Sequence, residues 1–480
     1  MGDDPAIRTS TTSLANGSLI ADGDDVLSRR VTRKIDIRVV PMLCALYLTA
    51  YLDRTNIGNA RLLGLEDELG MPSNGYNTAV WVFYLTFVLM EVPSNLLMTH
   101  SAIPPNYWLG VSMTLLGIVT MRQGFTQAPG ALYACRAIMG IFEGSLGPAA
   151  ALMMGAYYRK HEFAIRYTCF TTSALVGASF SSFLAYAINF MDGVQGISSW
   201  RWIFILEGLF NISVALCTFF VLLRFPAEST FLTADEKRNL LDRLHAERGD
   251  EAAEADQPWR SIFLNWQTWV NIIAYFSVDM SATAISQFSP TILKQLGSNW
   301  TANESNVRSV PVWLIGALIA LCTSLLFGKP QLRFPFIIAV SMLCLVGWSI
   351  QLAQVSSPGV RYFALYFIAA GAFVQLPLLV SWLSANTVGR RRKAVAHALQ
   401  IGLGNSANFA SANVFIKGES PRYTTGFTAG LVITVIGMMA ACLLEVILWR
   451  ANRAADEREE RGEIESKMVG KDGMRFRFTL

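Results

Sequence analysis

The chain has 480 residues, of which 52% are hydrophobic and 15% charged, and its mean hydropathy is +0.38. A water-soluble core cannot absorb so much apolar sequence, which excludes an ordinary soluble enzyme or binding domain. The formal net charge of +4 is small and the basic residues fall between apolar runs, so the composition predicts an all-α membrane protein and no nucleic-acid-binding surface.

Apolar runs long enough to cross a bilayer recur along the chain. A spanning helix needs roughly 20 apolar residues, and six such runs fill the first half: Ile37–Ile57, Thr78–Thr99, Tyr107–Phe125, Ala131–Tyr157, Phe163–Phe190 and Trp200–Leu223. Six more fill the second half: Trp269–Ile292, Pro311–Phe327, Phe334–Ala353, Tyr362–Leu383, Val395–Phe415 and Gly426–Trp449. The runs predict twelve transmembrane helices in two six-helix bundles.

Polar segments divide the chain into five expected parts. Residues 1–36 have no apolar core of a signal peptide and are expected to form a disordered cytosolic tail. Residues 37–223 and 266–449 are the two bundles, residues 224–265 a cytosolic linker, and residues 450–480 a cytosolic C-terminal tail.

The linker carries a helix-start signal. Thr233-Ala-Asp-Glu236 is a capping-box pattern, and Leu240, Leu241 and Leu244 follow at helical spacing. We therefore expect an amphipathic cytosolic helix between the bundles, which serves as a solvated connector with no regulatory role.

Basic residues gather in alternate connections between the runs. They precede the first run, follow the fourth, occupy the linker and lie between the tenth and eleventh runs: Arg29, Arg30, Arg33 and Lys34; Arg159 and Lys160; Lys237, Arg238, Arg243 and Arg248; and Arg390 to Lys393. Because basic loops stay on the cytosolic side, both termini are expected to be cytosolic, with the plasma membrane as the expected location.

Ionisable side chains inside the predicted spans require a reason, because each costs roughly 2.5–3.5 kcal/mol at mid-span on insertion scales. Most lie in the first half, and the second half keeps chiefly Asp279 and Glu445; the first-half set is Asp53, Arg54, Glu91, Arg136, Glu143 and Glu207. Charged chemistry is therefore expected in the first bundle.

Helical geometry sorts these side chains by direction. Arg136 and Glu143 share one face of their helix about 10 Å apart, too far for a tight pair. Tyr47, Tyr51 and Arg54 share a stripe, whereas Asp53 points about a quarter-turn away, toward a neighbouring helix.

Two guanidinium groups near one site repel each other unless a carboxylate neutralises them, which an anionic substrate can do. A structural ion-pair network of Asp53, Arg54, Arg136 and Glu143 is the alternative, and the two can coexist. Neutral polar groups of the second half are expected to orient the substrate, so the predicted substrate-binding set is Arg54, Arg136, Tyr47, Tyr51, Gln375, Asn386 and Asn405. We expect no cofactor or metal; the expected partners are a small organic anion, protons and the lipid bilayer, and we expect a monomer.

Six stretches taken together resemble the major facilitator superfamily and, within it, the anion:cation symporter family, especially the fungal allantoate, nicotinate and pantothenate permeases. They are Tyr51–Ala60, Glu91–Asn95, Arg136–Gly144, Trp202–Gly208, Trp382–Asn386 and Ser420–Tyr423. The resemblance implies the major facilitator fold, with alternating access between the two bundles. It also implies that Arg54 and Arg136 contact substrate and that Asp53 and Glu143 carry protons. Asp279 is not expected from the family, so we assign it a possible role in specificity.

The leading functional hypothesis is proton-coupled uptake of a small carboxylate, such as a vitamin or ureide. Residues 173–182 lack the glycine-proline signature associated with drug:proton antiporters, which favours symport. Export of an acidic secondary metabolite is the nearest alternative, and a transport-dead nutrient receptor is a third. No H-E-x-x-H or G-x-S-x-G pattern supports an enzyme.

Overall fold

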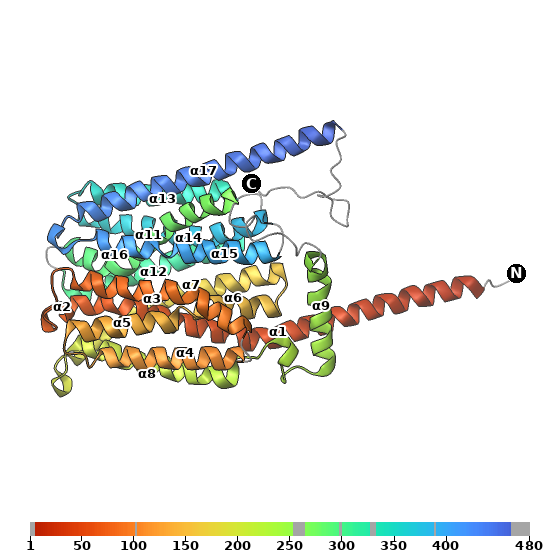
Figure 1. Cartoon of the computed structure of the whole chain (residues 1–480), viewed down its shortest axis with the longest axis horizontal. Coiled ribbons are helices and arrows are strands. Elements are labelled where there is room, and N and C mark those ends of the chain that lie inside the picture. The colour runs from red at the N-terminus through yellow and green to blue at the C-terminus, as the bar shows by residue number, and fades with distance from the viewer. Residues whose placement is uncertain are drawn as a thin grey trace.

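The computed structural model describes residues 5–100, 103–252, 265–296, 300–326, 333–387 and 390–461. Within these ranges the chain is helical and contains no strand. Long helices run side by side in one elongated block (Figure 1), with α2 (Leu65–Glu68) at one end and α9 (Ala234–Ala252) at the other. We call these the α2 end and the α9 end. The all-α prediction is confirmed.

All twelve predicted spans correspond to helices. The first bundle consists of α1 (Pro5–Leu62), α3 (Gly75–His100), α4 (Pro105–Gln123), the consecutive pair α5 (Pro129–Glu143) and α6 (Leu146–Tyr157), α7 (Lys160–Ile188) and α8 (Ser199–Val221). The second consists of α11 (Trp266–Leu296), α12 (Ala302–Leu326), α13 (Arg333–Leu352), α14 (Pro358–Asn386), the pair α15 (Arg390–Gly404) and α16 (Ala407–Val414), and α17 (Thr424–Glu460). Eight of the described segments qualify as spans by length and hydropathy alone; α3, α4, α11 and the α15–α16 pair complete the twelve.

One span in each half is interrupted near its middle. In the first half, α5 ends at Glu143 and α6 begins at Leu146. Pro148 has no backbone N–H to donate to the carbonyl of Gly144, which weakens the helix there. In the second half, the break falls between Gly404 and Ala407. Glu143 and Asn405 therefore lie at or beside helix ends within the block.

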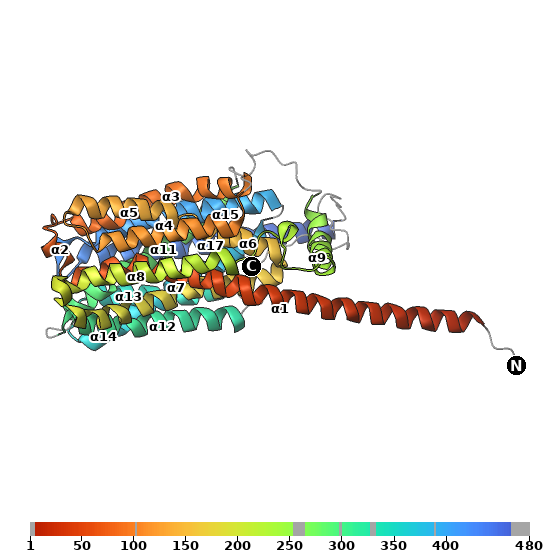
Figure 2. The ribbon, with the colours of Figure 1, turned by 90° about the horizontal axis from the view of Figure 1, so that it is seen from below.

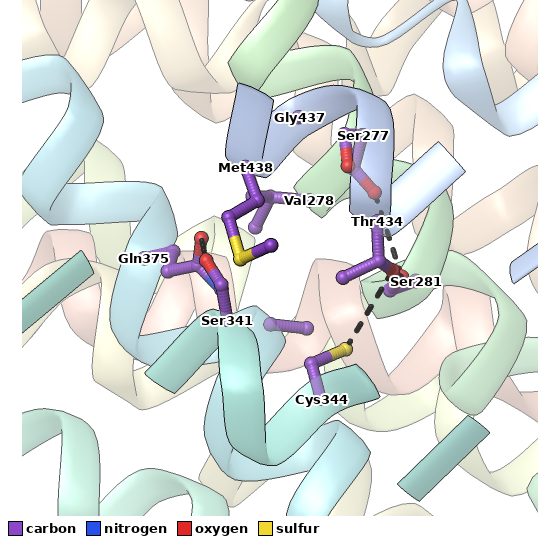
Figure 3. Close-up of a pocket in the computed structure, with 10 residues that line it drawn as sticks. Ser277, Val278, Ser281, Ser341, Cys344, Gln375, Thr434, Gly437 and Met438 are labelled. Carbon is purple, nitrogen blue, oxygen red and sulfur yellow. Dashed lines mark hydrogen bonds between the residues drawn. The ribbon is translucent and has the colours of Figure 1, made fainter. Parts of the chain in front are cut away.

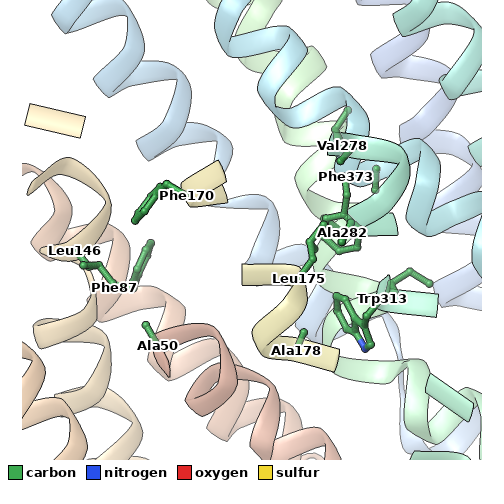
Figure 4. Close-up of a cluster of buried hydrophobic side chains, with 14 of the residues drawn as sticks. Ala50, Phe87, Leu146, Phe170, Leu175, Ala178, Val278, Ala282, Trp313 and Phe373 are labelled. Atoms are coloured by element: carbon green, nitrogen blue, oxygen red, sulfur yellow. The ribbon is translucent and has the colours of Figure 1, made fainter. Parts of the chain in front are cut away.

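An apolar core joins the two halves. The first-bundle helix α7 packs along the second-bundle helix α12. Leu175 and Ala178 of α7 lie beside Trp313 of α12 and Phe373 of α14 (Figure 4). Burial of apolar side chains thus holds the bundles together along one side, which leaves polar contacts to decide how they meet elsewhere.

Both chain ends differ from the tails predicted from sequence. The helix α1 begins at Pro5 and projects from the block (Figure 2). Val31 and Ile35 are fully buried, because this part of α1 packs against α9. At the other end, α17 continues past Trp449 to Glu460. Residues 29–36 and 450–460 are therefore helical. The polar sequence of residues 29–36 did not predict that this segment packs against α9.

The linker helix α9 begins with the predicted capping box. The Glu236 N–H donates to Oγ1 of Thr233 at 3.3 Å, and the Thr233 N–H donates to Oε2 of Glu236 at 3.1 Å. Of the three leucines predicted to form its apolar face, Leu240 and Leu244 are buried, whereas Leu241 is only partly buried. Glu236 also forms an ion pair with Lys34 of α1, which ties the linker to the first bundle.

The docking of α9 should depend on pH. The hydrogen bond from Lys34 lowers the pKa of Glu236 below its ordinary value of 4.5. A group whose pKa is lower in the folded state stabilises that state above its unfolded pKa, and the stabilisation is lost as pH falls through the folded pKa. We expect amide hydrogen exchange in α9 to quicken below about pH 4.5 relative to a Glu236→Gln variant at the same pH. Equal pH responses in the two proteins would contradict the prediction.

Gly140 of α5 and Gly144, the residue that follows this helix, let α3 and α5 approach closely. A Cβ atom at Gly140 would lie 2.3 Å from the carbonyl oxygen of Phe83, and one at Gly144 would lie 2.7 Å from that of Phe87. Gly147 is different, because nothing lies within 4 Å of its added Cβ.

Gly140→Ala is therefore expected to destabilise the protein by about 1–3 kcal/mol, the usual cost of overpacking. Gly147→Ala is the matched control and should be close to neutral. Thermal unfolding of the two purified variants in detergent measures the difference, and equal melting temperatures would show that α3 and α5 can separate without cost.

Candidate functional site

Arg54 of α1 and Glu143 of α5 form a buried ion pair. Nε and Nη2 of Arg54 both donate to Oε1 of Glu143, at 3.0 and 2.5 Å, while Oε2 of Glu143 has no hydrogen-bond partner in the described part of the chain. Glu143 is 1% exposed and Arg54 is 9% exposed. The guanidinium thus has one carboxylate partner, held by one oxygen.

Aromatic rings surround this guanidinium. The ring centroids of Tyr51 and Phe87 each lie 4.8 Å from Cζ of Arg54, and that of Tyr84 lies 5.8 Å away. Tyr47 packs edge-to-face on Tyr51. The predicted stripe of Tyr47, Tyr51 and Arg54 is therefore a continuous surface, in which ring faces stabilise a cation that has little water around it.

Asp53 points away from Arg54, into the first bundle. Its Oδ2 accepts hydrogen bonds from Asn211 Nδ2 at 2.6 Å and Thr120 Oγ1 at 3.1 Å, and its Oδ1 has no hydrogen-bond partner among the residues that the structure describes. These donors come from α8 and α4. The sequence-based expectation that Asp53 faces neighbouring helices agrees with this geometry.

Arg136 lies on the same buried face of α5 as Glu143 but makes no ion pair with it. Within the described ranges its Nε and Nη2 lack hydrogen-bond partners, and its guanidinium lies 6.0 Å from the ring centroid of Phe204. It interacts electrostatically with both Asp53 and Glu143. Arg136 therefore lies within the field of two carboxylates, with donor groups still unused.

The second bundle contributes Asp279 and Asn405 to the same region. Asp279 of α11 accepts a hydrogen bond from Asn408 Nδ2 at 3.0 Å and interacts electrostatically with Arg54. Asn405, in the break between α15 and α16, donates to Oε2 of Glu91 in α3 at 3.4 Å. We call Tyr47, Tyr51, Arg54, Tyr84, Glu91, Glu143, Asp279 and Asn405 the central cluster; it lies where the bundles meet.

Three predicted substrate-binding residues lie outside this cluster: Arg136 of α5, and Gln375 and Asn386 of α14. Gln375 of α14 accepts a hydrogen bond from Ser341 Oγ at 2.9 Å and donates to the Gly371 carbonyl at 2.8 Å. It lines a cavity of about 10 Å³ inside the second bundle (Figure 3), about the smallest that holds one water molecule. Asn386 is buried at the last residue of α14. Helical position alone could not distinguish a side chain facing the interface from one facing the interior of its bundle.

Gln287 is a contact residue that the sequence analysis missed. Its side-chain Nε2 donates to the backbone carbonyl of Arg54 and to the Tyr84 hydroxyl, each at 3.3 Å. Its backbone carbonyl accepts a hydrogen bond from the Tyr76 hydroxyl at 2.9 Å. The sequence signal for Gln287 is a polar amide side chain within the otherwise apolar run of α11. Glu91 was noted as a buried charge, but its partner on the other bundle was not predictable.

Further polar contacts close the interface at the α2 end. Asn77 Nδ2 donates to the Phe415 carbonyl at 3.3 Å, and Lys417 pairs with Glu66 at 2.8 Å. Toward the α2 end, these contacts and the Tyr76–Gln287 hydrogen bond close the interface beyond the central cluster. Toward the α9 end, the contact between Glu91 and Asn405 is the last one within the cluster itself.

The arrangement of two six-helix bundles around buried charge matches a known family. Residues 43–443 match the Major Facilitator Superfamily. The chain belongs to this superfamily. It is accordingly a membrane transporter and not an enzyme.

Relatives and solved structures agree with this placement. An uncharacterized transporter of Schizosaccharomyces pombe is 31% identical over 95% of this chain and 91% of its own length. A high-affinity nicotinic acid transporter of Saccharomyces cerevisiae is 27% identical over 88% of this chain and 78% of its own. A proton:xylose symporter of the superfamily, at 13% identity, superimposes with a TM-score of 0.68 over 87% of this transporter and 96% of its own chain. The last comparison concerns the fold alone.

The Arg54–Glu143 pair should show strong coupling in stability. Glu143→Gln leaves a buried guanidinium without its counter-charge and should cost about 3–5 kcal/mol. Adding Arg54→Met removes that charge, so the double variant should be more stable than Glu143→Gln alone. Thermal unfolding of the two single variants and the double variant measures the coupling energy. Additive losses would show that the pair contributes nothing as a pair.

Proposed function

We propose that this transporter carries a small organic anion, a carboxylate, together with protons, as a member of the anion:cation symporter branch. The observation that supports this most directly is the Arg54–Glu143 ion pair at the bundle interface. The similarity to a nicotinic acid transporter supports an organic anion as the substrate class. We also propose that both termini face the cytosol and that the plasma membrane is its location, because the basic loops gather at the α9 end.

The coupling follows from competition for one guanidinium. Arg54 uses Nε and Nη2 on a single oxygen of Glu143. When Glu143 takes up a proton it loses its charge, and those two donors become available to a substrate carboxylate in bidentate geometry. Conversely, a bound anion neutralises Arg54 and favours the protonated form of Glu143. Each ligand therefore increases the affinity for the other by the same factor.

Other side chains have supporting roles in this proposal. Tyr47 and Tyr51 offer ring faces and hydroxyl groups to the substrate, and Arg136 adds positive potential from within the first bundle. Asn405 belongs to the cross-bundle contact with Glu91, so it links substrate binding to closure. Gln375 has no role in this proposal, because its hydrogen bonds to Ser341 and Gly371 hold it inside the second bundle. Asn386, the last residue of α14, is also assigned no role.

Transport in reconstituted vesicles with an imposed pH gradient tests the proposal. A panel of labelled carboxylates should include one that accumulates on the less acidic side. Arg54→Lys keeps the charge but lacks the planar two-donor fork, so substrate affinity should fall roughly tenfold to a hundredfold. Glu143→Gln should lose gradient-driven accumulation but retain exchange between preloaded vesicles, since the amide resembles the protonated acid.

The matched control is Arg201→Lys, because Arg201 also pairs with a carboxylate of the first bundle, Glu68, but at the α2 end. It should retain substrate affinity. Undiminished accumulation by folded Glu143→Gln would overturn the coupling mechanism. Accumulation on the acidic side would instead identify a proton-driven exporter.

A further inference from the structure

A series of aromatic rings begins beside Arg54 and passes from α1 to α7. The ring centroid of Tyr51 lies 4.8 Å from Cζ of Arg54, and Tyr51 packs edge-to-face on Tyr47 with the ring centroids 5.6 Å apart. Tyr47 stacks on Phe170 of α7, with the centroids 4.2 Å apart and an interplanar angle of 17°. Ring contacts of 5.8 and 5.3 Å extend the series along α7. We call these residues the ring series: Tyr51, Tyr47, Phe170, Tyr167 and Phe163.

The ring series runs from the central cluster toward the α9 end. Near the start of α7, Glu162 pairs with Arg243 of α9, and α1 also packs against α9 before it enters the block. Farther along, Asn59 of α1 donates to Ser181 of α7 at 2.9 Å, so the two helices run in the same direction. Residue numbers therefore fall toward the α9 end on both helices, and Phe163 is the member of the series nearest to that end.

The rings on α7 face the interior of the molecule. The exposed residues Ile165, Phe180 and Phe183 share one side of this helix, which is the side available to lipid. At 3.6 residues per turn, Tyr167 and Phe170 lie on roughly the opposite side. Phe170 is buried and Tyr167 is half-buried. The ring series is therefore not part of the lipid-facing surface.

A run of rings can serve only to pack two helices, but the close contact of α1 and α7 is made by other residues. A Cβ atom at Gly177 would lie 2.4 Å from the carbonyl oxygen of Leu48, so a glycine sets the helix separation there. Tyr47 and Tyr51 are only partly buried. Ring surface beside Arg54 is therefore still available for a further contact.

The arrangement favours a planar substrate. A carboxylate that accepts two parallel hydrogen bonds from a guanidinium lies in the guanidinium plane. In an aromatic acid the ring is conjugated with the carboxylate and continues in that plane, so it would extend from Arg54 as a flat group. Aromatic rings attract one another in stacked and edge-to-face geometries beyond the burial of apolar area, which a saturated ring of similar size does not match.

We propose that the transported carboxylate is aromatic, with its carboxylate on Arg54 and its ring against Tyr47 and Tyr51. Phe170 is a positioning residue, because it acts on the substrate through the ring of Tyr47 that it stacks on. The other two members of the ring series extend the same aromatic surface toward the α9 end. The proposal rests on the proposed function, in which Arg54 binds a carboxylate.

Binding of matched acids to the purified transporter tests the substrate class. Each pair is an aromatic acid and its ring-hydrogenated counterpart: benzoate with cyclohexanecarboxylate, and naphthoate with decahydronaphthalenecarboxylate. Equilibrium dialysis of the labelled acids at neutral pH measures each Kd, with protein-free detergent micelles as the background. We expect the aromatic acid of a pair to bind about twofold to tenfold more tightly.

The outcomes separate this proposal from the proposed function. Equal affinities within the pairs, or tighter binding of the hydrogenated acids, would overturn the aromatic class and leave a carboxylate substrate in place. If no acid of either kind binds, the proposed function fails, and the aromatic class fails with it.

Substitution of the rings distinguishes substrate contact from helix packing. Tyr47→Leu keeps an apolar side chain but removes the ring, so the affinity ratio within a pair should fall toward one, whereas Tyr47→Phe should retain it. Phe170→Leu should lower the ratio in the same direction, and it decides the question if Tyr47→Leu does not fold. The matched control is Tyr186→Leu, because Tyr186 is another half-buried tyrosine of α7 and packs edge-to-face on Phe190, outside the ring series. Unchanged ratios in folded Tyr47→Leu and Phe170→Leu, or an equal loss in Tyr186→Leu, would show that these rings only pack the helices.

Discussion

The cost of holding charge in the bilayer interior governs the centre of this transporter. Arg54 cannot lose its proton under ordinary conditions, so a carboxylate must accompany it whenever water is excluded. In the structure that carboxylate belongs to Glu143 of the neighbouring helix. Any event that neutralises Glu143 leaves Arg54 in need of another anion, and the coupling proposed above depends on this need.

The positions of the contacts make that local event relevant to the whole molecule. Gln287 of the second bundle donates to the backbone carbonyl of Arg54 itself, and Glu91 contacts Asn405 in the helix break of the second bundle. Apolar packing of α7 on α12 persists along one side of the interface. Rocking about that apolar contact, with polar contacts exchanged at the two ends, is the motion that this distribution permits.

The two halves share a fold but differ in chemistry. The first bundle encloses Asp53, Arg136, Glu143 and Glu207, whereas the second offers Asp279 beside neutral amides and hydroxyls. Close helix contacts such as α3 against α5 at Gly140 leave little room for water around the first-bundle charges. The charges of these side chains therefore depend for their stabilisation on the few protein groups beside them.

The sequence by itself determined the class of protein, the twelve helices and the start of α9, because bilayer thickness, apolar runs and capping residues are local constraints. It also predicted that Arg54 and Asp53 point in different directions, which follows from helical geometry. Only the tertiary structure decided which residue of α5 forms an ion pair with α1: it is Glu143, which pairs with Arg54, whereas Arg136 pairs with neither acid of this region. It also decided that Gln375 faces the interior of its own bundle and that the segment before Ile37 packs against α9. Those outcomes depend on how each helix is rotated about its axis and on which distant helix it meets, and neither quantity is encoded in the spacing of residues along one helix.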